Sequence, residues 1–194
     1  RRWNTFTDHW LSALQGYPVF MFDPAHLGSH HRYNQSERDV TRLGRYGSGN
    51  DLAGYVLYPF RAIPVLARFR REHVRQLRQS DPRRYSAAMR QYITIAAIYA
   101  LGLLLNPAKT ALFVFVPHVF GLHFLVGSNY LQHAHATVGS RYNHSRNFTG
   151  VINTLLFNVG YHTAHHEWPD LHWSRLPDAH ARLRDRIDVQ LLEP

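Results

Sequence analysis

The sequence of 194 residues contains no cysteine. This absence excludes a disulfide framework, an iron–sulfur cluster and a thiolate zinc site, and with them the usual small secreted domains. The chain also has no internal repeat and no low-complexity segment, so its length suits one domain with a core. It begins at Arg1 without a signal-peptide pattern. We therefore interpret residues 1–194 as a single domain that is a fragment of a longer chain.

Acidic residues are scarce: the chain has 13 Asp and Glu and 22 Lys and Arg, so its formal charge is +9. Such a surplus suggests nucleic acid, anionic lipid or an acidic substrate as a partner. Residues 61–90 carry nine arginines and only two acids, Glu72 and Asp81, and a long apolar run follows at once. This arrangement favours a lipid surface over nucleic acid.

Two uncharged runs, residues 92–105 and 110–129, flank the break Asn106-Pro107-Ala108-Lys109. They predict a transmembrane hairpin, although the first run is shorter than the roughly 20 residues that span a bilayer. It therefore has to borrow Gln91 and Asn106 or cross a thinned region. The arginines on one flank place residues 61–90 on the cytoplasmic side. The alternative is a buried hairpin of a soluble protein, but the runs are apolar all round rather than striped.

Three further segments complete the predicted all-α membrane fold. Residues 1–22 predict an amphipathic helix that ends near Gly16. Residues 52–69, with Pro59 and Pro64, predict a broken segment that lies in the membrane interface or packs as core. Residues 42–51 predict a polar loop. The last predicted element is a basic helix that begins at Leu176-Pro177.

Histidines are crowded near the end of the chain, where His162, His165 and His166 fall within five positions. At about 100° per residue on an α-helix, the three imidazoles can converge on one side. Neutral imidazole suits iron, zinc, copper or nickel, and the lack of cysteine argues against a closed structural zinc site. The alternative is a histidine-rich surface turn. The density favours a metal site.

A second triplet strengthens that interpretation. His26 and His30 are four residues apart and share a helical face, and His31 follows them. Asp39 is a candidate acceptor for an imidazole N–H, which would fix the ring tautomer, and the alternative role for it is a solubilising loop residue. Two triplets in one short chain make chance crowding a poor explanation.

The second apolar run ends in Asn129 and His133, which are again four apart. We expect His133 to be a ligand and Asn129 to hold a water on the metal. His118 and His123 lie deeper in the run and predict either a substrate channel or packing against neighbours. Because a hairpin returns the chain to its starting side, all three histidine segments should meet at one membrane face.

The order His-x-x-x-His-His, apolar hairpin, Asn-x-x-x-His and His-x-x-His-His resembles the membrane fatty acid desaturase superfamily, over nearly the whole chain. The resemblance implies a four-span fold with histidine boxes that form a cytoplasmic cap. It also implies a non-haem di-iron centre with Asn129 acting through a water. The implied iron ligands are His26, His30, His31, His133, His162, His165 and His166.

The same resemblance implies an enzyme that uses dioxygen and two external electrons from ferredoxin, rubredoxin or cytochrome b5. Its substrate would be a fatty acyl lipid, acyl-CoA or acyl carrier, and its location the bacterial inner membrane. Family members have an earlier histidine box just before a segment like Arg1-Arg2-Trp3-Asn4, and it is absent here. We therefore expect this chain alone to bind fewer than two irons and to be inactive.

Three functions remain open. The spacing of His26 and His30 resembles both alkane hydroxylases and bacterial desaturases, whereas residues 160–177 look more like bacterial fatty acid desaturases. We predict a desaturase that introduces a double bond into an acyl chain, with an alkane or fatty acyl hydroxylase as the alternative. A membrane metal-binding or zinc-transport protein is a third possibility. It would line a path with ligands rather than gather them at the membrane edge.

Overall fold

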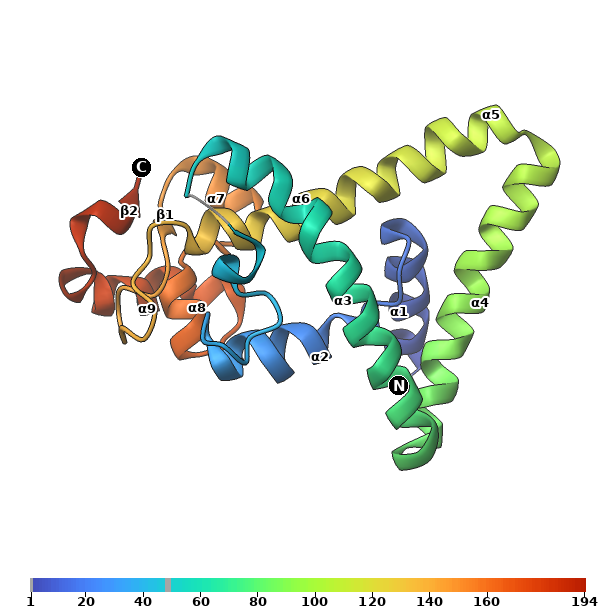
Figure 1. Cartoon of the computed structure of the whole chain (residues 1–194), viewed down its shortest axis with the longest axis horizontal. Helices are drawn as coiled ribbons and strands as arrows, with labels where there is room; N and C mark the ends of the chain where they lie inside the picture. Colours follow the sequence, from blue (N-terminus) through green and yellow to red (C-terminus); the bar gives the residue numbers. More distant parts are fainter. Residues whose placement is uncertain (1, 48–49) are drawn as a thin grey trace. The chain divides into compact units, whose positions relative to one another are not determined.

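A computed structural model describes residues 2–47 and 50–194, and the predicted all-α architecture is confirmed (Figure 1). The chain forms two compact units, Arg1–Gly28 with Ile63–Val126 (unit 1) and Ser29–Ala62 with Gly127–Pro194 (unit 2). The elements of unit 1 are α1 (Arg2–Gln15), η1 (Val19–Met21), α2 (Asp23–Ala25), α4 (Pro82–Leu105), α5 (Pro107–Thr110) and η4 (Ala111–Phe115). Three elements contain a boundary between the units: η2 (His26–His31), α3 (Leu52–Ser80) and α6 (Val116–His133).

Unit 2 holds η3 and the short elements of the C-terminal part of the chain. They are η3 (Leu43–Tyr46), β1 (Asn147–Phe148), α7 (Val151–Leu155), α8 (His162–Glu167), η5 (Trp173–Arg175), α9 (Leu176–Leu183), η6 (Arg184–Arg186), η7 (Val189–Leu191) and β2 (Leu192–Glu193). The two strands form a parallel pair in which Asn147 lies opposite Leu192. The predicted basic helix from Leu176 is α9, continued by the short turn η6.

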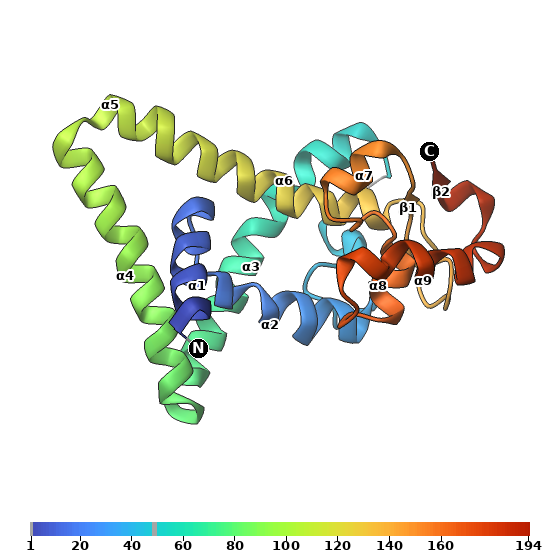
Figure 2. The ribbon, with the colours of Figure 1, turned by 180° about the vertical axis from the view of Figure 1, so that it is seen from behind.

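Helix α1 ends at the predicted place because Gly16 takes a left-handed conformation, with φ +75°. The helix lies beside α4 in unit 1 (Figure 2). Ser12 Oγ donates a buried hydrogen bond to Gln91 Oε1 at 3.1 Å, and His9 Nδ1 lies 3.2 Å from Thr94 Oγ1. Polar side chains thus fix the packing of α1 on the first apolar helix.

The predicted hairpin is confirmed, and its turn lies at Asn106, whose side chain accepts a hydrogen bond from the Lys109 N–H at 2.9 Å. The first helix is longer than the apolar run, because the Asp81 side chain caps it and Pro82 starts it. Two helical stretches, Pro82–Leu105 and Pro107–His133, are long and apolar enough to cross a membrane. Only 17% of the apolar window of each is buried, which does not fit the core helices of a soluble protein.

The predicted break at Pro59 and Pro64 is wrong, because α3 runs through both prolines from Leu52 to Ser80. Each proline removes one helical hydrogen bond, yet the helix persists because tertiary packing overrides local propensity. Tyr58 and Ala62 are 1% and 0% exposed, so this part of the helix is core. Of the two predicted roles for the segment, core packing applies to this face.

Unit 1 contains a cavity of about 490 Å³ between its helices. Aromatic and aliphatic side chains dominate its wall, and Arg70 and Arg71 contribute the charge. His118 lines this cavity and is hydrogen-bonded to the Tyr99 hydroxyl at 2.8 Å and to the Ala13 carbonyl at 2.9 Å. Both predicted roles for His118, lining a channel and packing, fit this position.

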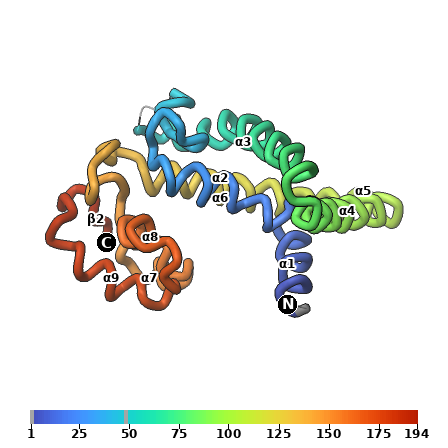
Figure 3. The backbone as a smooth tube through the Cα atoms, turned by 90° about the horizontal axis from the view of Figure 1, so that it is seen from below, coloured from blue at the N-terminus to red at the C-terminus, as the bar shows by residue number. Residues whose placement is uncertain are grey.

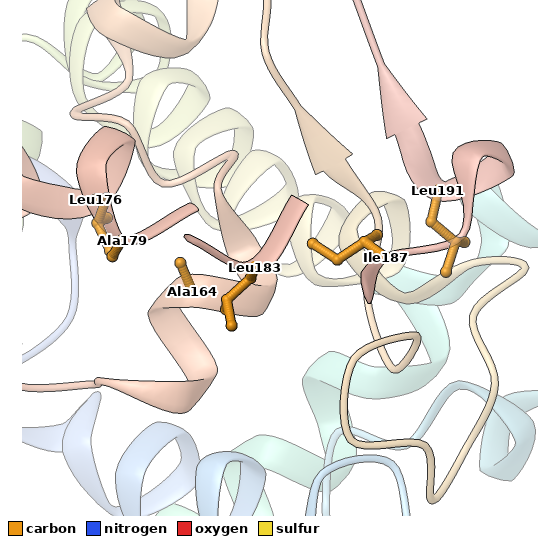
Figure 4. Packing of buried hydrophobic residues seen from close by; sticks show 6 residues of the cluster. All are labelled: Ala164, Leu176, Ala179, Leu183, Ile187 and Leu191. Atoms are coloured by element: carbon orange, nitrogen blue, oxygen red, sulfur yellow. The ribbon is translucent and has the colours of Figure 1, made fainter. Parts of the chain in front are cut away.

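Helix α8, which carries the last histidine triplet, is held in unit 2 by a hydrophobic cluster (Figure 4). The cluster joins α8 to α9 and to the segment after it, and α8 and α9 lie side by side in the tube view (Figure 3). Its buried members are Ala164, Leu176, Ala179, Leu183, Ile187 and Leu191. Fully burying one such leucine contributes roughly 1.5–3 kcal/mol, so this small core suffices to fix a six-residue helix.

A polar clamp supports the other side of α8. The Asn147 side chain donates to Thr163 Oγ1 at 2.9 Å and accepts from the Thr163 N–H at 3.1 Å. Ser145 Oγ lies 2.8 Å from the same Thr163 hydroxyl. All three residues are buried, so the loop before β1 sets the position of the first turn of α8.

Candidate metal centre

His30 is the best-anchored histidine of the first triplet, with 1% of its surface exposed. Its Nδ1–H donates to Asp39 Oδ2 at 2.9 Å, and the Thr41 hydroxyl lies 3.0 Å from the same nitrogen. Asp39 thus takes the acceptor role predicted from its position in the sequence. With the proton on Nδ1, the Nε2 atom carries the free lone pair that a metal ligand needs.

The Asp39 carboxylate is itself saturated with donors. Besides His30 it accepts from the Gln35 N–H, the Thr41 N–H and the Thr41 hydroxyl, each at 2.8 Å. Burial raises the pKa of Asp39, but the hydrogen bonds from His30 and the two backbone N–H groups outweigh burial and lower it to about 2. Asp39 therefore stays ionised and holds the His30 ring in one orientation.

His133, at the end of α6, brings a second element to His30. Its Nδ1–H donates to the His144 carbonyl at 2.9 Å, and its Nε2 lies 3.0 Å from the Nε2 of His30 and 3.1 Å from that of His162. The Nε2 atoms of His162 and His166 are 3.2 Å apart. Nitrogens bound to one metal at about 2.0–2.1 Å lie roughly 3 Å from one another, so this spacing fits a shared ion.

We call His30, His133, His162 and His166 the first nitrogen group. One ligand nitrogen from each lies within 4.8 Å of all the others. The four residues come from η2, α6 and α8, which lie far apart in the sequence, and all four belong to unit 2. The predicted meeting of the three histidine segments is therefore observed for these four side chains.

A second pair lies next to this group. His31 Nε2 is 3.1 Å from His165 Nε2, and the His31 ring stacks on that of His166 with centroids 4.3 Å apart. The last triplet, whose imidazoles were predicted to lie on one side of a helix, divides between the first nitrogen group and this pair. His26 opens the same helix as His31 and belongs to unit 1.

The helix η2 is a π-helix rather than the α-helix assumed from the sequence. Its hydrogen bonds run from i to i+5, so His26 and His31 share a face, whereas an α-helix would pair His26 with His30. Adjacent residues point in different directions on any helix, so His30 and His31 meet different partners, and the π-register brings His31 towards the face of His26. Single π-turns of this kind are frequent at functional sites.

Three imidazoles of the centre, those of His31, His165 and His166, stay neutral near pH 7. Burial, together with the neighbouring His165 and His30, lowers the pKa of His31 to about 3. Burial and the rings of His162 and His133 hold the pKa of His166 well below its usual value, and burial does the same to a smaller degree for His165. Neutral rings keep their lone pairs, which is the protonation state that binds a metal.

Asn129 lies one helical turn before His133, and its amide is fixed by a small network. Its Nδ2 donates to the Tyr58 hydroxyl at 2.7 Å and to the Thr41 carbonyl at 3.2 Å, and Tyr58 donates to the same carbonyl at 2.7 Å. Since Thr41 also contacts His30, the amide is tied to the segment that orients the first nitrogen group. The Asn129 carbonyl oxygen is the part of the side chain that can hold a water.

Sequence reasoning missed His144, which lies in the loop after α6. It is 5% exposed, and its ring centroid is 5.1 Å from that of His166. A lone histidine in a polar loop gives no spacing signal, so only the fold reveals it. The histidines left out of the predicted site, such as His9 and His172, make their contacts with Thr94 and Ser174 instead.

Together these features define a helical protein with two candidate membrane-crossing helices and a cluster of histidines that could hold a metal. The family model described as fatty acid desaturase matches residues 1–192, and the chain belongs to this family. It is a membrane protein, as the family and the two apolar helices agree.

One curated relative is the sphingolipid delta(4)-desaturase of Candida albicans (strain SC5314 / ATCC MYA-2876). It is 43% identical over 47 residues, which cover 24% of this chain and 11% of that relative. The shared segment is thus a small part of the relative's length. No solved structure matches the chain.

Proposed function

We propose that this chain is the catalytic part of a membrane di-iron oxidoreductase that introduces a double bond into a fatty acyl chain. The observation that carries the proposal is the first nitrogen group, four imidazole nitrogens within 4.8 Å of one another, next to the His31–His165 pair. Family membership supports a desaturase-type reaction. When bound, the two irons would supply the activation of dioxygen that removes hydrogen from an unactivated C–H bond.

The donor set supports iron over zinc. A structural zinc site closes with four ligands, often including cysteine, and a catalytic one keeps three protein ligands. Here we propose seven imidazoles: the first nitrogen group, the His31–His165 pair and His26, which shares the helical face of His31. Seven nitrogen ligands exceed the need of one zinc. They would leave one iron of a two-iron site short of ligands, in line with the expectation that this chain alone binds fewer than two irons.

The remaining residues would orient and shield the centre. Asp39 holds the proton of His30 on Nδ1, and the His144 carbonyl does the same for His133. Asn129 would hold a water beside the metals with its carbonyl oxygen, because Tyr58 engages its amide nitrogen. His30, His133 and His162 are each at most 4% exposed, so bulk water is excluded from the ligand nitrogens, which protects the reaction from competing water.

The acyl substrate and the electrons come from outside the chain. A fatty acyl lipid, acyl-CoA or acyl-carrier thioester fits a family member with two membrane-crossing helices. We propose ferredoxin, rubredoxin or cytochrome b5 as the donor of the two electrons. The arginines of residues 61–90 support a position of the histidine boxes on the cytoplasmic side of a bacterial inner membrane.

Two measurements test the proposal. Protein purified under reducing, iron-replete conditions should contain iron rather than zinc by elemental analysis, and His133→Ala should lose most of it. Cells that express the chain in its natural gene context should produce an unsaturated acyl chain, detected by mass spectrometry as the loss of two hydrogens. A hydroxylated acyl chain would support the hydroxylase alternative. Zinc in a stable protein without redox activity would support a metal-binding or transport protein.

A further inference from the structure

His144 presents a buried imidazole whose protonation is set by the backbone. Its Nδ1 lies 3.0 Å from the Arg141 carbonyl and 3.2 Å from the Ser140 carbonyl. Both partners are acceptors, so the ring must carry its proton on Nδ1. The other nitrogen, Nε2, therefore holds a lone pair and can only accept.

That lone pair has nothing to accept from among the described residues. His144 is only 5% exposed, and its Nε2 atom is buried and lacks a hydrogen-bond partner. The carboxylate of Glu167 is engaged elsewhere, because it pairs with Arg141 at 2.8 Å. A buried acceptor without a donor calls for a group that the protein itself does not provide.

The His144 ring lies beside one member of the first nitrogen group. Its centroid is 5.1 Å from that of His166, with the planes at 67°. Within the first nitrogen group, His166 has centroid distances of 4.7 Å to His162, 4.8 Å to His30 and 5.2 Å to His133. His144 thus lies as close to His166 as the other three members do.

The backbone of the same residue already serves the centre. The His144 carbonyl accepts the Nδ1–H of His133 at 2.9 Å, so a shift of this loop would turn a ligand ring. The Asn143 N–H bonds to the Ser140 hydroxyl at 3.1 Å, and the Asn143 carbonyl accepts from the Thr137 N–H at 2.7 Å. The loop is therefore closed by bonds that do not involve the Nε2 atom of His144.

We propose that His144 is a further metal ligand of this centre, binding through Nε2 beside His166. The proposal rests on the proposed function, because it requires that the centre holds metal. It adds an eighth imidazole to the seven predicted from the sequence. Unlike the others, this ligand comes from a loop and from no histidine box.

The test compares His144→Asn with the matched variant His180→Asn in the full chain. The asparagine amide reaches about as far as Nδ1, so it keeps the bonds to the Ser140 and Arg141 carbonyls and deletes only Nε2. His180 is also 5% exposed in unit 2, but its ring packs on Tyr161 with centroids 4.7 Å apart. Circular dichroism of the metal-free proteins checks that each variant folds.

The readout is metal binding, measured with Co²⁺ by its visible absorption and with Zn²⁺ by competition against a chelator. Loss of a ligand should weaken binding at one metal by at least about 10-fold and change the Co²⁺ spectrum in H144N, whereas H180N should match the wild type. His144→Gln carries an amide oxygen to the place of Nε2 and should recover part of the affinity.

Each other outcome decides against a stated claim. Wild-type affinity and spectrum in H144N would refute the ligand role and leave the proposed function intact. Equal losses in H144N and H180N, or no recovery in H144Q, would assign the effect to packing and also refute it. A folded wild-type chain that binds neither metal would instead remove the proposed function.

Discussion

The substitution Asp39→Asn should damage both the stability of the protein and its metal centre. The carboxylate accepts four hydrogen bonds, two on each oxygen, from His30, Gln35 and Thr41. An amide can replace only one oxygen as an acceptor, because its NH₂ group faces two donors wherever it points. Two hydrogen bonds to a charged group are lost, at roughly 1.5–3 kcal/mol each. We expect a loss of about 3–6 kcal/mol in the free energy of unfolding, which is the sum of these two losses.

Asp39→Asn should also weaken metal binding, because it changes the tautomer of His30. An NH₂ group placed against Nδ1 would favour the ring form with its proton on Nε2, which removes the lone pair from the first nitrogen group. Loss of such a supporting partner typically costs 10–100-fold in metal affinity, so we expect a weakening of about that size. Thermal unfolding in detergent and competition against a chelator measure the two effects.

The neighbouring carboxylate supplies the control. Glu37 pairs with Arg42 at the surface, where its side chain is 84% exposed, and exposed pairs contribute only about 0–1 kcal/mol. Glu37→Gln should therefore leave stability and metal affinity nearly unchanged. If Asp39→Asn behaved like Glu37→Gln in both measurements, the assignment of Asp39 as the residue that orients His30 would be refuted.

Three other perturbations probe separate features. Metal-free protein should lose stability as the pH falls from about 6.5 towards 3. The reason is that the pKa of His31 is lowered to about 3 in the folded protein, so the unfolded chain takes up the proton first. A flat profile of melting temperature across that range would contradict this. Gly16→Ala should cost more than the roughly 1–2 kcal/mol of an alanine in the left-handed conformation, because its Cβ would lie 2.5 Å from a histidine ring. Gly139→Ala is the control, since Gly139 has φ +83° and open space around it, and this variant should show only the cost of the left-handed backbone. Equal melting temperatures would count against the contact. Tyr58→Phe should cost about 1–3 kcal/mol through the bond from the Asn129 amide at 2.7 Å, and an unchanged urea midpoint would show that this network contributes nothing.

The sequence was informative where the signal is local. The triplet at His162 and the pair Asn129–His133 could be recognised because ligand spacing on a helix depends only on nearby positions. The turn at Asn106 was equally readable, since a capping side chain and a proline mark it. These features needed no knowledge of tertiary contacts.

What the sequence could not provide depends on contacts between distant segments. Proline propensity predicted a break in α3, but burial of Tyr58 and Ala62 keeps the helix continuous. The role of His144 depends on a loop folding back towards His166, for which no sequence period exists. The π-register of η2, which brings His31 towards the face of His26, is likewise not what a regular α-helix predicts.

The π-register of η2 also affects how the number of residues between two histidines of a box is interpreted. His162 and His166 are four residues apart on an α-helix, and His26 and His31 are five apart on a π-helix, so each box spans one hydrogen-bond repeat of its own helix type. A helix that accommodates one additional residue in this way can keep the same metal geometry although the histidines of the motif are spaced differently in the sequence. Counting the residues between box histidines therefore reports how the chain is coiled, and it is a poor guide to whether the product carries a double bond or a hydroxyl group.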